Sequence, residues 1–517
     1  MKFFILLLFT FICFSIAEPI VVHGVVYSDL NSDGQRNENE PGIPGVLVSN
    51  SKDVVVTNER GEYTLTLEEN CTVFITKPAN YKTRISPFKI PQFYFHYQKE
   101  DSKLYFRGIP HTKAIPHSLD FPLYPCKENE NFDILVVADP QPETAQELDY
   151  IRQDLIEEVI TDPSNLSFGL VLGDVMFERL DLLNYYVPLL SVMPFPMYHA
   201  IGNHDVNYDA LDDAHSDETF KRWFGPTSFS FDYAKIHFIL LDSIFHFRDP
   251  QTGQPKYEAR VTEKQLQWLK NDLAHVDKEK LIVIATHAPF FTTTDKSVKG
   301  TIQNKNEVLS LLSDYKVLSL AGHTHHQYQQ WITSKKDWKG KTPFHQIICT
   351  TLCGSWWAGP QDSRGVPDST QQDGVPNGYY IFSFQGTEYT YRFKASGKPE
   401  SYQMQIHAPN GIVSIDESDK EKVLVLEFEH TDKSQAYYSL DGQEFQPLKS
   451  TYATDPMASI LLDSNKLNKK IWVHSQKTRN LWTAPLPKLS IGSHRIIVKI
   501  VDQFGRTFQS CKIFWVM

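Results

Sequence analysis

The sequence predicts a central α/β domain with a largely parallel sheet, flanked along the chain by two β-sandwich domains. From Phe132 onward, apolar runs of strand length alternate with helical stretches, a pattern typical of a parallel sheet covered by helices. Before and after this region, short apolar runs alternate with Gly, Pro and Asn turns, which favours β-sandwiches. The chain length of 517 residues fits two to four domains.

The N-terminus has the composition of a secretory signal. Lys2 precedes the apolar run from Phe3 to Ile16, and Ser15 and Ala17 are small residues of the kind a signal peptidase accepts. We expect residues 1–17 to be a signal peptide rather than a buried strand. No later apolar run reaches the roughly 18 residues of a membrane span. A secreted, periplasmic or secretory-lumen protein without a transmembrane anchor is therefore predicted.

Residues 18–125 are expected to form the first β module, with strands at 20–26, 46–48 and 63–67. The stretches Gly24–Tyr27, Gly42–Val46 and Asn58–Tyr63 resemble small β-sandwich modules of the collagen-adhesin B type. In those modules, Gly-rich turns link the strands of a transthyretin-like sandwich.

A candidate calcium loop lies inside this module. Oxygen-bearing residues alternate before Gly34, and a glutamate follows six positions later, which matches the spacing of a calcium-binding loop. The expected ligands are Asp29, Asn31, Asp33 and Glu40. The alternative is an acidic, solvated hairpin loop.

The central domain is expected over residues 126–394. Its strands are predicted at Ile134–Ala138, Leu170–Leu172, Pro196–Ala200, Ile236–Leu241, Leu281–Thr286 and Val317–Leu320. Its helices are predicted at Thr144–Ile160, Asp181–Leu190, Thr262–Val276 and Asn304–Ser313. Thr262 and Gln265 have the spacing of a capping box at the start of the third helix.

After the linker Lys394–Pro399, the helical pattern stops and a C-terminal β-sandwich is expected over residues 395–517. Its strands are predicted at Val423–Phe428, Ala436–Leu440, Ile471–His474 and His494–Val501. Five cysteines remain after the leader. A Cys71–Cys126 disulfide remains an open possibility. Cys349 and Cys353 are expected to be structural thiols or a local disulfide.

Polar residues with metal-ligating side chains follow the predicted strands of the central domain. In open α/β sheets, ligands bind at the carboxyl ends of the strands. Each residue has a structural alternative, such as a turn cap or a core histidine, but five such strand ends in one domain favour a functional site. The strand ends carry Asp139 with Gln141, Asp174, Asn203-His204-Asp205, His287, and His323 with His325.

The order of these motifs resembles the calcineurin-like metallophosphoesterases over about residues 132–390. That family's pattern is Asp-x-His/Gln, Gly-Asp, Gly-Asn-His-Asp/Glu, His, and Gly-His-x-His. The stretches Gly354–Pro360 and Asp373–Tyr380, with the flanking β domains, are similar to an exported three-domain subgroup. The resemblance implies a four-layer αββα sandwich core between an N-terminal and a C-terminal β-sandwich.

The resemblance also implies two divalent metal ions. The first would be held by Asp139, Gln141, Asp174 and His325, and the second by Asp174, Asn203, His287 and His323. His204 would act on the substrate phosphoryl group or the leaving oxygen, with Asp205 orienting its ring. Manganese, iron, zinc and magnesium all remain open. Gln141 replaces a histidine found in many relatives, which favours ions that prefer oxygen ligands.

The expected activity is hydrolysis of a phosphate monoester or diester by metal-activated hydroxide. Candidate substrates are a phosphorylated small molecule, a lipid head group or a phosphoprotein, with Trp356 and Trp357 as a stacking wall. The formal charge of -11 gives no nucleic-acid-binding footprint. One alternative is a surface or matrix-binding protein with an inert core, which the complete ligand set disfavours. The expected leader disfavours a protein phosphatase of the cytosolic type.

Overall fold

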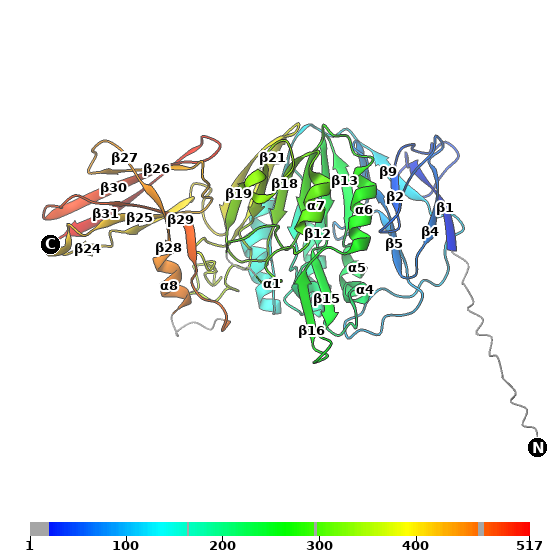
Figure 1. The fold of residues 1–517 in the computed structure, drawn as a ribbon, viewed down its shortest axis with the longest axis horizontal. Helices are drawn as coiled ribbons and strands as arrows, with labels where there is room; N and C mark the ends of the chain where they lie inside the picture. Colours follow the sequence, from blue (N-terminus) through cyan, green and yellow to red (C-terminus); the bar gives the residue numbers. More distant parts are fainter. Residues whose placement is uncertain (1–19, 163–164, 294–296, 464–469) are drawn as a thin grey trace, which may run out of the picture.

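The structure, a computed structural model, describes residues 20–162, 165–293, 297–463 and 470–517. The expected signal peptide, residues 1–17, lies outside these ranges. Figure 1 shows three consecutive parts in a row, with the N-terminal strands at one end, the α/β region in the middle and the C-terminal strands at the other end. The C-terminal strands extend furthest from the central region.

The N-terminal part consists of two facing sheets. The first has the strand order β4-β1-β9-β6-β7 and the second the order β3-β2-β5-β8. Strand β1 pairs antiparallel with β4 and parallel with β9. The strands are β1 (Ile20–Ser28), β2 (Leu47–Ser49), β3 (Val54–Val56), β4 (Glu62–Leu67), β5 (Cys71–Thr76), β6 (Tyr81–Ile85), β7 (Pro91–Gln92), β8 (Tyr94–Tyr97) and β9 (Phe121–Pro125).

The central part also contains two sheets, where the strand–helix alternation alone predicted one. Their strand orders are β12-β11-β10-β21-β22 and β13-β14-β17-β18-β20-β19. In the first sheet, β12, β11 and β10 are parallel from one edge inward, and β21 and β22 continue the sheet antiparallel. In the second sheet, β14, β17, β18 and β20 are parallel, and antiparallel β13 and β19 form the edges. The first sheet comprises β10 (Asn131–Val137), β11 (Leu166–Leu172), β12 (Met197–Ala200), β21 (Gly378–Gln385) and β22 (Glu388–Ala395). The second comprises β13 (Phe229–Tyr233), β14 (Ile236–Leu240), β17 (Leu281–Ala285), β18 (Lys316–Ala321), β19 (Tyr328–Ile332) and β20 (Phe344–Ile348).

Helices cover the outer faces of both sheets, which confirms the four-layer αββα core. The first sheet carries α1 (Ala145–Ile151), the π-helix η1 (Arg152–Ile156), α2 (Glu157–Thr161) and α3 (Leu183–Leu189). The second sheet carries α6 (Glu263–Leu273) and α7 (Lys305–Leu312), which lie in front of it in Figure 1. Shorter elements are the 3-10 helix η4 (Asn203–Asp205), α4 (Asp213–Ser216), α5 (Glu218–Phe224), and the hairpin β15 (Ile244–Arg248) and β16 (Pro255–Ala259).

Helix α6 shows how the sequence sets these covering helices. The Thr262 side chain accepts a hydrogen bond from the Gln265 backbone N–H, and the Gln265 side chain accepts one from the Thr262 backbone N–H, as the capping-box spacing predicted. Leu266, Leu269 and Leu273 fall on one stripe at helical spacing and are buried against the sheet.

The C-terminal part is a third pair of sheets, ordered β23-β25-β29-β28 and β24-β31-β30-β26-β27. The strands are β23 (Met404–Ala408), β24 (Ile412–Val413), β25 (Lys422–Glu427), β26 (Gln435–Leu440), β27 (Gln446–Pro447), β28 (Lys449–Thr454), β29 (Lys477–Pro485), β30 (Gly492–Val501) and β31 (Thr507–Val516). Two expectations were wrong. Residues 471–474 form a turn and loop rather than a strand, and a helix, α8 (Pro456–Leu462), begins after the capping residue Asp455.

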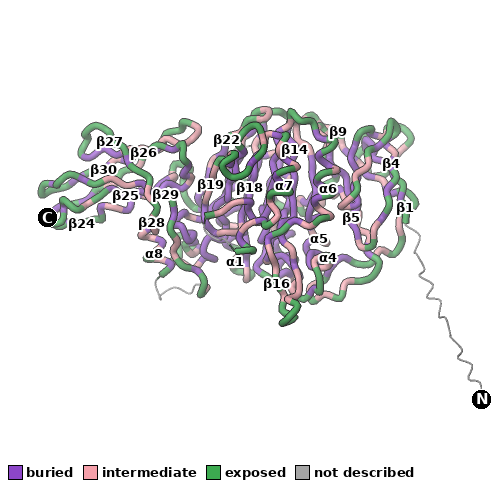
Figure 2. Tube along the Cα trace, in the orientation of Figure 1, coloured by how far each residue is buried: buried purple, intermediate pink, exposed green. Residues whose placement is uncertain are grey.

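One hydrophobic core runs through all three parts. It includes Phe74 of β5, the central sheets, and Leu424 and Leu426 of β25. The alternate residues Val423 and Val425 belong to a second core inside the C-terminal sandwich. Because neighbouring strand residues point to opposite faces, the sheet containing β25 is buried on both faces. Figure 2 shows this continuous burial through the centre of the molecule.

The five described cysteines, Cys71, Cys126, Cys349, Cys353 and Cys511, are all free thiols. The open possibilities of a Cys71–Cys126 bridge and a local Cys349–Cys353 bridge are therefore not realised. Among the residues that the structure describes, no helix combines the length and apolar character needed to traverse a bilayer.

Candidate metal centre

The strand ends identified in the sequence meet at one edge of the two central sheets. Asp139 follows β10, Asp174 follows β11, and Asn203 begins η4 after β12. His287 follows β17, while His323 and His325 follow the neighbouring strand β18. Parallel strands end at the same edge of a sheet, so these six residues from distant segments come together, with Gln141 two residues past Asp139.

Asp174 lies at the centre of this group. Its Oδ2 accepts a hydrogen bond from Gln141 Nε2 at 2.8 Å and lies 3.2 Å from His287 Nε2. Its Oδ1 accepts the backbone N–H of His204 at 2.8 Å. The carboxylate therefore faces residues of both expected metal sites, as a bridging ligand must.

The expected second site is the more compact of the two. His287 Nε2 lies 3.2 Å from Asn203 Oδ1 and 3.1 Å from His323 Nδ1. One ligand atom from each of Asp174, His287 and His323 lies within 4.8 Å of the others, a spread that one cation could span. This set mixes carboxylate, amide and imidazole ligands, which suits several first-row divalent metals.

At the expected first site, His325 Nε2 lies 3.7 Å from Asp139 Oδ1. Both oxygens of Asp139 lie within 3.1 Å of the His323 backbone N–H. The Gln141 Oε1 atom faces the Cys353 thiol at 3.4 Å, while its Nε2 faces Asp174. A half-turn of the amide exchanges these two atoms and would bring the oxygen towards the carboxylates.

Each of the three histidines uses its other ring nitrogen on a backbone carbonyl. His287 Nδ1 bonds to Leu172 O at 2.9 Å, His323 Nε2 to Lys299 O at 2.9 Å, and His325 Nδ1 to Gly354 O at 2.8 Å. A carbonyl can only accept, so each bonded nitrogen carries a proton, and the opposite nitrogen faces the other ligands of the site. This is the arrangement that orients histidines at metal sites.

The backbone of the site is unusual. Asp139, Gln141, Asp174, His323 and His325 have φ between 46° and 75°, so five of the seven expected ligands lie in the left-handed region. Such conformations cost roughly 1–3 kcal/mol each and concentrate at functional sites. Gly173, with φ of 88°, lies so close to His287 that a Cβ atom there would be 2.7 Å from its ring.

Burial and neighbouring charged residues shift the pKa values of several residues of the site. Burial raises the pKa of Asp139 to about 7, and Asp174 adds to the effect. Burial also acts on Asp174, but His287 and His204 outweigh it and hold the pKa of Asp174 below its usual range. Burial and the neighbouring His287 lower the pKa of His323 to about 3. Burial opposes the charged form of His287, but Asp174 and Asp139 outweigh it and raise the pKa of His287 to about 9. A divalent cation would supply positive charge at the same place among the buried carboxylates.

The expected role of Asp205 as the partner of His204 was wrong. The two Asp205 oxygens accept backbone N–H groups of Val175, Met176 and Gly202 at 2.9–3.0 Å, which fixes the loops after β11 and β12. The carboxylate beside His204 is Glu178, with Oε1 3.3 Å from Nδ1. The sequence gave no indication of Glu178, because it lies four residues past Asp174 in an irregular loop.

The two adjacent tryptophans have different environments. Trp357 is buried and its Nε1 donates to Asp154 at 3.0 Å, so its expected contact with substrate was wrong. Trp356 lies in the site, where its ring stacks on His325 with centroids 4.3 Å apart. The sequence pattern alone could not separate them, since both rings are aromatic and only one has a buried carboxylate partner.

Trp472 completes an aromatic cluster around the site and was not identified from the sequence. Phe177 stacks on His204 with centroids 4.4 Å apart, and the Trp472 ring is parallel to Phe177 at 6.4 Å. Trp472 also lies 6.2 Å from Trp356. This residue belongs to the loop that the sequence predicted to be a strand of the C-terminal sandwich.

The candidate calcium loop is held by its own backbone. Asp29 accepts the N–H groups of Ser32 and Gly34, and Glu40 accepts those of Leu30 and Asn37, at 2.7–2.9 Å. Asn31 and Asp33 form the same kind of turn bonds. These oxygens already define the loop conformation, and calcium binding by Asp29, Asn31, Asp33 and Glu40 stays a prediction.

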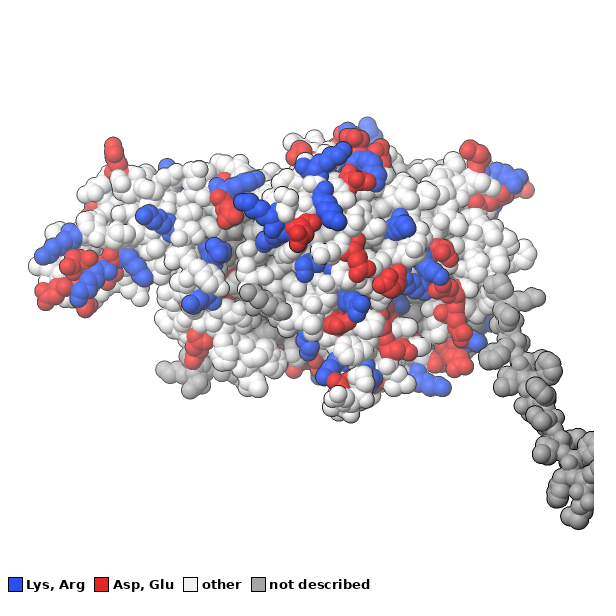
Figure 3. Space-filling view, in the orientation of Figure 1, with Lys and Arg blue, Asp and Glu red and all other residues white. Residues whose placement is uncertain are grey.

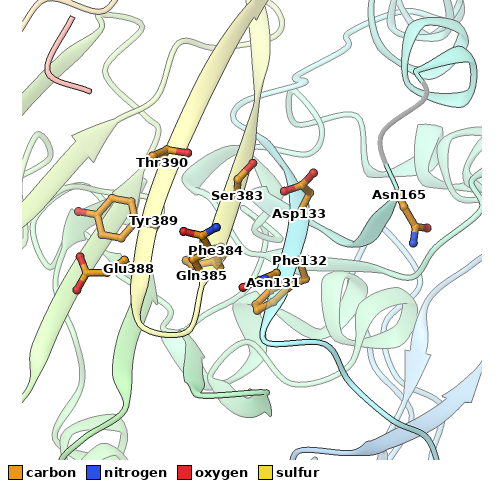
Figure 4. Close-up of a pocket in the computed structure, with 10 residues that line it drawn as sticks. All are labelled: Asn131, Phe132, Asp133, Asn165, Ser383, Phe384, Gln385, Glu388, Tyr389 and Thr390. Carbon is orange, nitrogen blue, oxygen red and sulfur yellow. The ribbon is translucent and has the colours of Figure 1, made fainter. Parts of the chain in front are cut away.

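A hollow beside β10, with a volume of about 450 Å³, is bounded by Asn131, Asp133 and Glu388 and opens at the amino end of that strand (Figure 4). Asp139 follows the opposite end of that strand. On the face shown in Figure 3, positive and negative side chains are interspersed.

Comparisons with known proteins give the family of the chain. Three family models match in succession: N terminal of calcineurin-like phosphoesterase at residues 30–108, calcineurin-like phosphoesterase at residues 132–327, and C terminal of calcineurin-like phosphoesterase at residues 347–508. No curated protein matches the chain.

Among solved structures, one similar chain is the purple acid phosphatase PPD1 from yellow lupin (Lupinus luteus) seeds. It is 14% identical, with 72% of this chain and 67% of that chain covered and a TM-score of 0.35. Another is Vps29 from Chaetomium thermophilum, 12% identical, with 52% and 100% covered and a TM-score of 0.22.

These family matches support a phosphoric ester hydrolase. The chain belongs to the calcineurin-like phosphoesterase family and has the three-part organisation of the subgroup with N-terminal and C-terminal domains. Family membership implies divalent metal ions and phosphorylated substrates.

Proposed function

We propose that this protein is a secreted dimetal phosphoesterase that hydrolyses a phosphate monoester or diester. The observation that carries the proposal is the orientation of the three histidines. Each donates to a backbone carbonyl and turns its opposite nitrogen towards the group around Asp174. A divalent ion would take the place of the proton that His287 Nε2 holds beside Asp174, and all three of these nitrogens could then be ligands.

The proposed ligand assignment follows the distances. Asn203, His287 and His323 would hold one ion, and Asp139, Gln141 and His325 the other, with Asp174 between them. Bound divalent ions would supply a nucleophile at neutral pH and clamp the phosphoryl group. The donors do not select one metal among manganese, iron, zinc and magnesium.

His204 is proposed to protonate the leaving oxygen. Burial disfavours its charged form, but Asp174 and Glu178 outweigh burial and raise the pKa of His204. A protonated imidazole beside the phosphoryl group is a suitable general acid. Because Nδ1 lies beside Glu178, Nε2 is the nitrogen available to the substrate.

The test begins with full-length mature protein stripped of metal and reloaded with Mn²⁺, Zn²⁺, Mg²⁺ or Fe²⁺. Each form is offered nitrophenyl phosphate and bis-nitrophenyl phosphate, and bound metal is counted by elemental analysis. We expect two ions per chain and turnover of at least one ester. The preferred ester assigns the enzyme as a monoesterase or a diesterase.

Asp174→Asn should lose both activity and at least one ion, since it removes a charge from the bridging position. Asp314→Asn is the matched control, because Asp314 is an exposed carboxylate just before β18, at the opposite end of that strand from His323. Turnover by Asp174→Asn equal to that of the wild type would refute the proposal. Export is tested separately, by sequencing the N-terminus of the protein recovered outside the cell.

A further inference from the structure

We propose that Trp472, supplied by the C-terminal sandwich, is a specificity-determining residue that binds a ring-bearing alcohol portion of the phosphoester substrate. The inference rests on the proposed function and adds a substrate class to it. Its starting point is an exposed aromatic surface at the metal centre. Trp472 is 53% exposed although it lies one ring away from both His204 and His325.

Trp472 lies on the side of the metal centre where the leaving alcohol of the substrate would lie. The His204 ring packs on Phe177, and the Phe177 ring is parallel to Trp472 with an interplanar angle of 5°. His204 is the proposed donor to the leaving oxygen, so the alcohol attached to that oxygen would emerge on this side. A flat, half-exposed indole is a stacking surface for a ring.

A second observation supports a binding site here. Trp356, which lies 6.2 Å from Trp472 and stacks on His325, has its indole Nε1 buried and without a hydrogen-bond partner among the described residues. Buried donors are nearly always satisfied, so an unpaired one at a candidate active site indicates a place for a ligand acceptor. A substrate oxygen beside Trp356 would fill it.

The loop that carries Trp472 is attached to the catalytic part. Lys470 forms an ion pair with Glu143 and lies 4.7 Å over the Phe177 ring. Further along the same segment, the Gln476 backbone N–H donates to Gln372 O at 2.8 Å. These contacts hold the loop of Trp472 against the catalytic part, so the exposed face of the indole lies beside the metal centre.

The C-terminal sandwich is also hydrogen-bonded to the segment that follows His325. Gln327, two residues past His325, donates to Glu429 at 3.2 Å and accepts from Asn480 at 3.2 Å. Glu429 also accepts the Tyr380 hydroxyl at 2.6 Å. The sandwich therefore acts as one wall of the active site as well as a terminal domain.

The experiment measures kcat/KM for the phenyl and methyl esters of whichever phosphate class the wild type hydrolyses. In Trp472→Ala, the phenyl-to-methyl ratio should fall roughly three- to tenfold through a higher KM for the phenyl ester. Trp472→Phe should restore most of the ratio because it keeps a stacking ring. Using the ratio of two esters cancels a general loss of activity.

Trp515→Ala is the matched control, since Trp515 is a comparably exposed tryptophan on β31 of the same sandwich, and its ratio should equal that of the wild type. A wild type that hydrolyses neither ester overturns the proposed function and this inference with it. An active wild type whose ratio is unchanged in Trp472→Ala overturns the inference alone. In that case Trp472 only docks the domain, and its loss would appear in the melting temperature.

Discussion

His204 lies between the carboxylate of Glu178 and the ring of Phe177, which fixes both its charge and its plane. Replacing it with alanine should lower kcat about 10²–10⁴-fold for an alkyl ester, because the leaving alkoxide then departs unprotonated. The loss should be much smaller for a nitrophenyl ester, whose leaving group needs little protonation. Measuring kcat for both esters checks this. Equal losses would mean that His204 acts on the phosphoryl oxygens instead.

Gly322 is as important to the site as a ligand. A Cβ atom at this position would lie 2.1 Å from Asp139 Oδ2, so Gly322→Ala must displace that carboxylate. We expect metal affinity to fall roughly 10–100-fold, the usual effect of disturbing a residue that positions a ligand. A competitive chelator titration measures it. Unchanged affinity would show that Asp139 is not a ligand.

At this scale the sequence was a good guide to which polar residues come together and a poor one to their hydrogen-bond partners. Asp139, Asp174 and His287 could be identified because each ends a buried strand, and strand ends are visible as apolar runs. The Asp205–His204 pairing could not be judged, because three backbone N–H groups brought together by folding decide where that carboxylate turns.

Among the elements, β14 is tied to its neighbours by a buried charge network. His237 bonds to Asp232 of β13 at 2.8 Å and to Asp272 of α6 at 2.9 Å. Burial opposes a charged ring, but Asp272 and Asp232 outweigh it and raise the pKa of His237 from 6.5 to about 9. The network also reaches Thr76 of the N-terminal module through Asp272.

This raised pKa predicts a pH-dependent stability. The contribution of His237 should be fully present below pH 6.5, on the order of 3 kcal/mol, and be lost as the pH rises through about 9. In denaturant unfolding, His237→Gln should be less stable than the wild type at pH 6, and the gap should narrow above pH 9. His275→Gln, an exposed position, is the control. A stability difference between the wild type and His237→Gln that does not change with pH would contradict a charged His237.

The predicted elements were mostly correct in kind, and the errors have physical causes. Helix α6 was recognisable from its cap and apolar stripe, which are local signals. The division of the strands into two sheets followed only from the family resemblance and was not recognisable from the strand–helix alternation, since pairing is decided by contacts between distant segments. The 471–474 stretch looks like a strand because Ile471 and Trp472 are apolar, yet it is a loop against the metal centre.

The molecule as a whole is joined by one apolar core that includes residues of all three parts. Phe74 of the N-terminal module packs edge-on against Trp268 of α6, and Phe428 of the C-terminal part packs against Phe393 of β22. Interfaces this apolar leave little room for independent domain motion.

Unfolding should therefore be cooperative across the three parts. Phe74→Ala and Phe428→Ala should each destabilise the protein by about 3–5 kcal/mol, and both should lower the same calorimetric transition. The measurement is differential scanning calorimetry of the metal-loaded protein. Separate transitions, with each variant moving only its own, would mean that the parts fold independently.

The left-handed backbone at five of the expected ligands has a consequence for how this protein can change. Glycine adopts such a conformation without strain, and at Asp139 it would also remove a buried carboxylate whose pKa is raised. Asp139→Gly should thus make the metal-free chain harder to melt while it weakens the metal centre. Heat tolerance and catalysis compete at these positions, and selection for thermal resistance without metal would eliminate the ligands first.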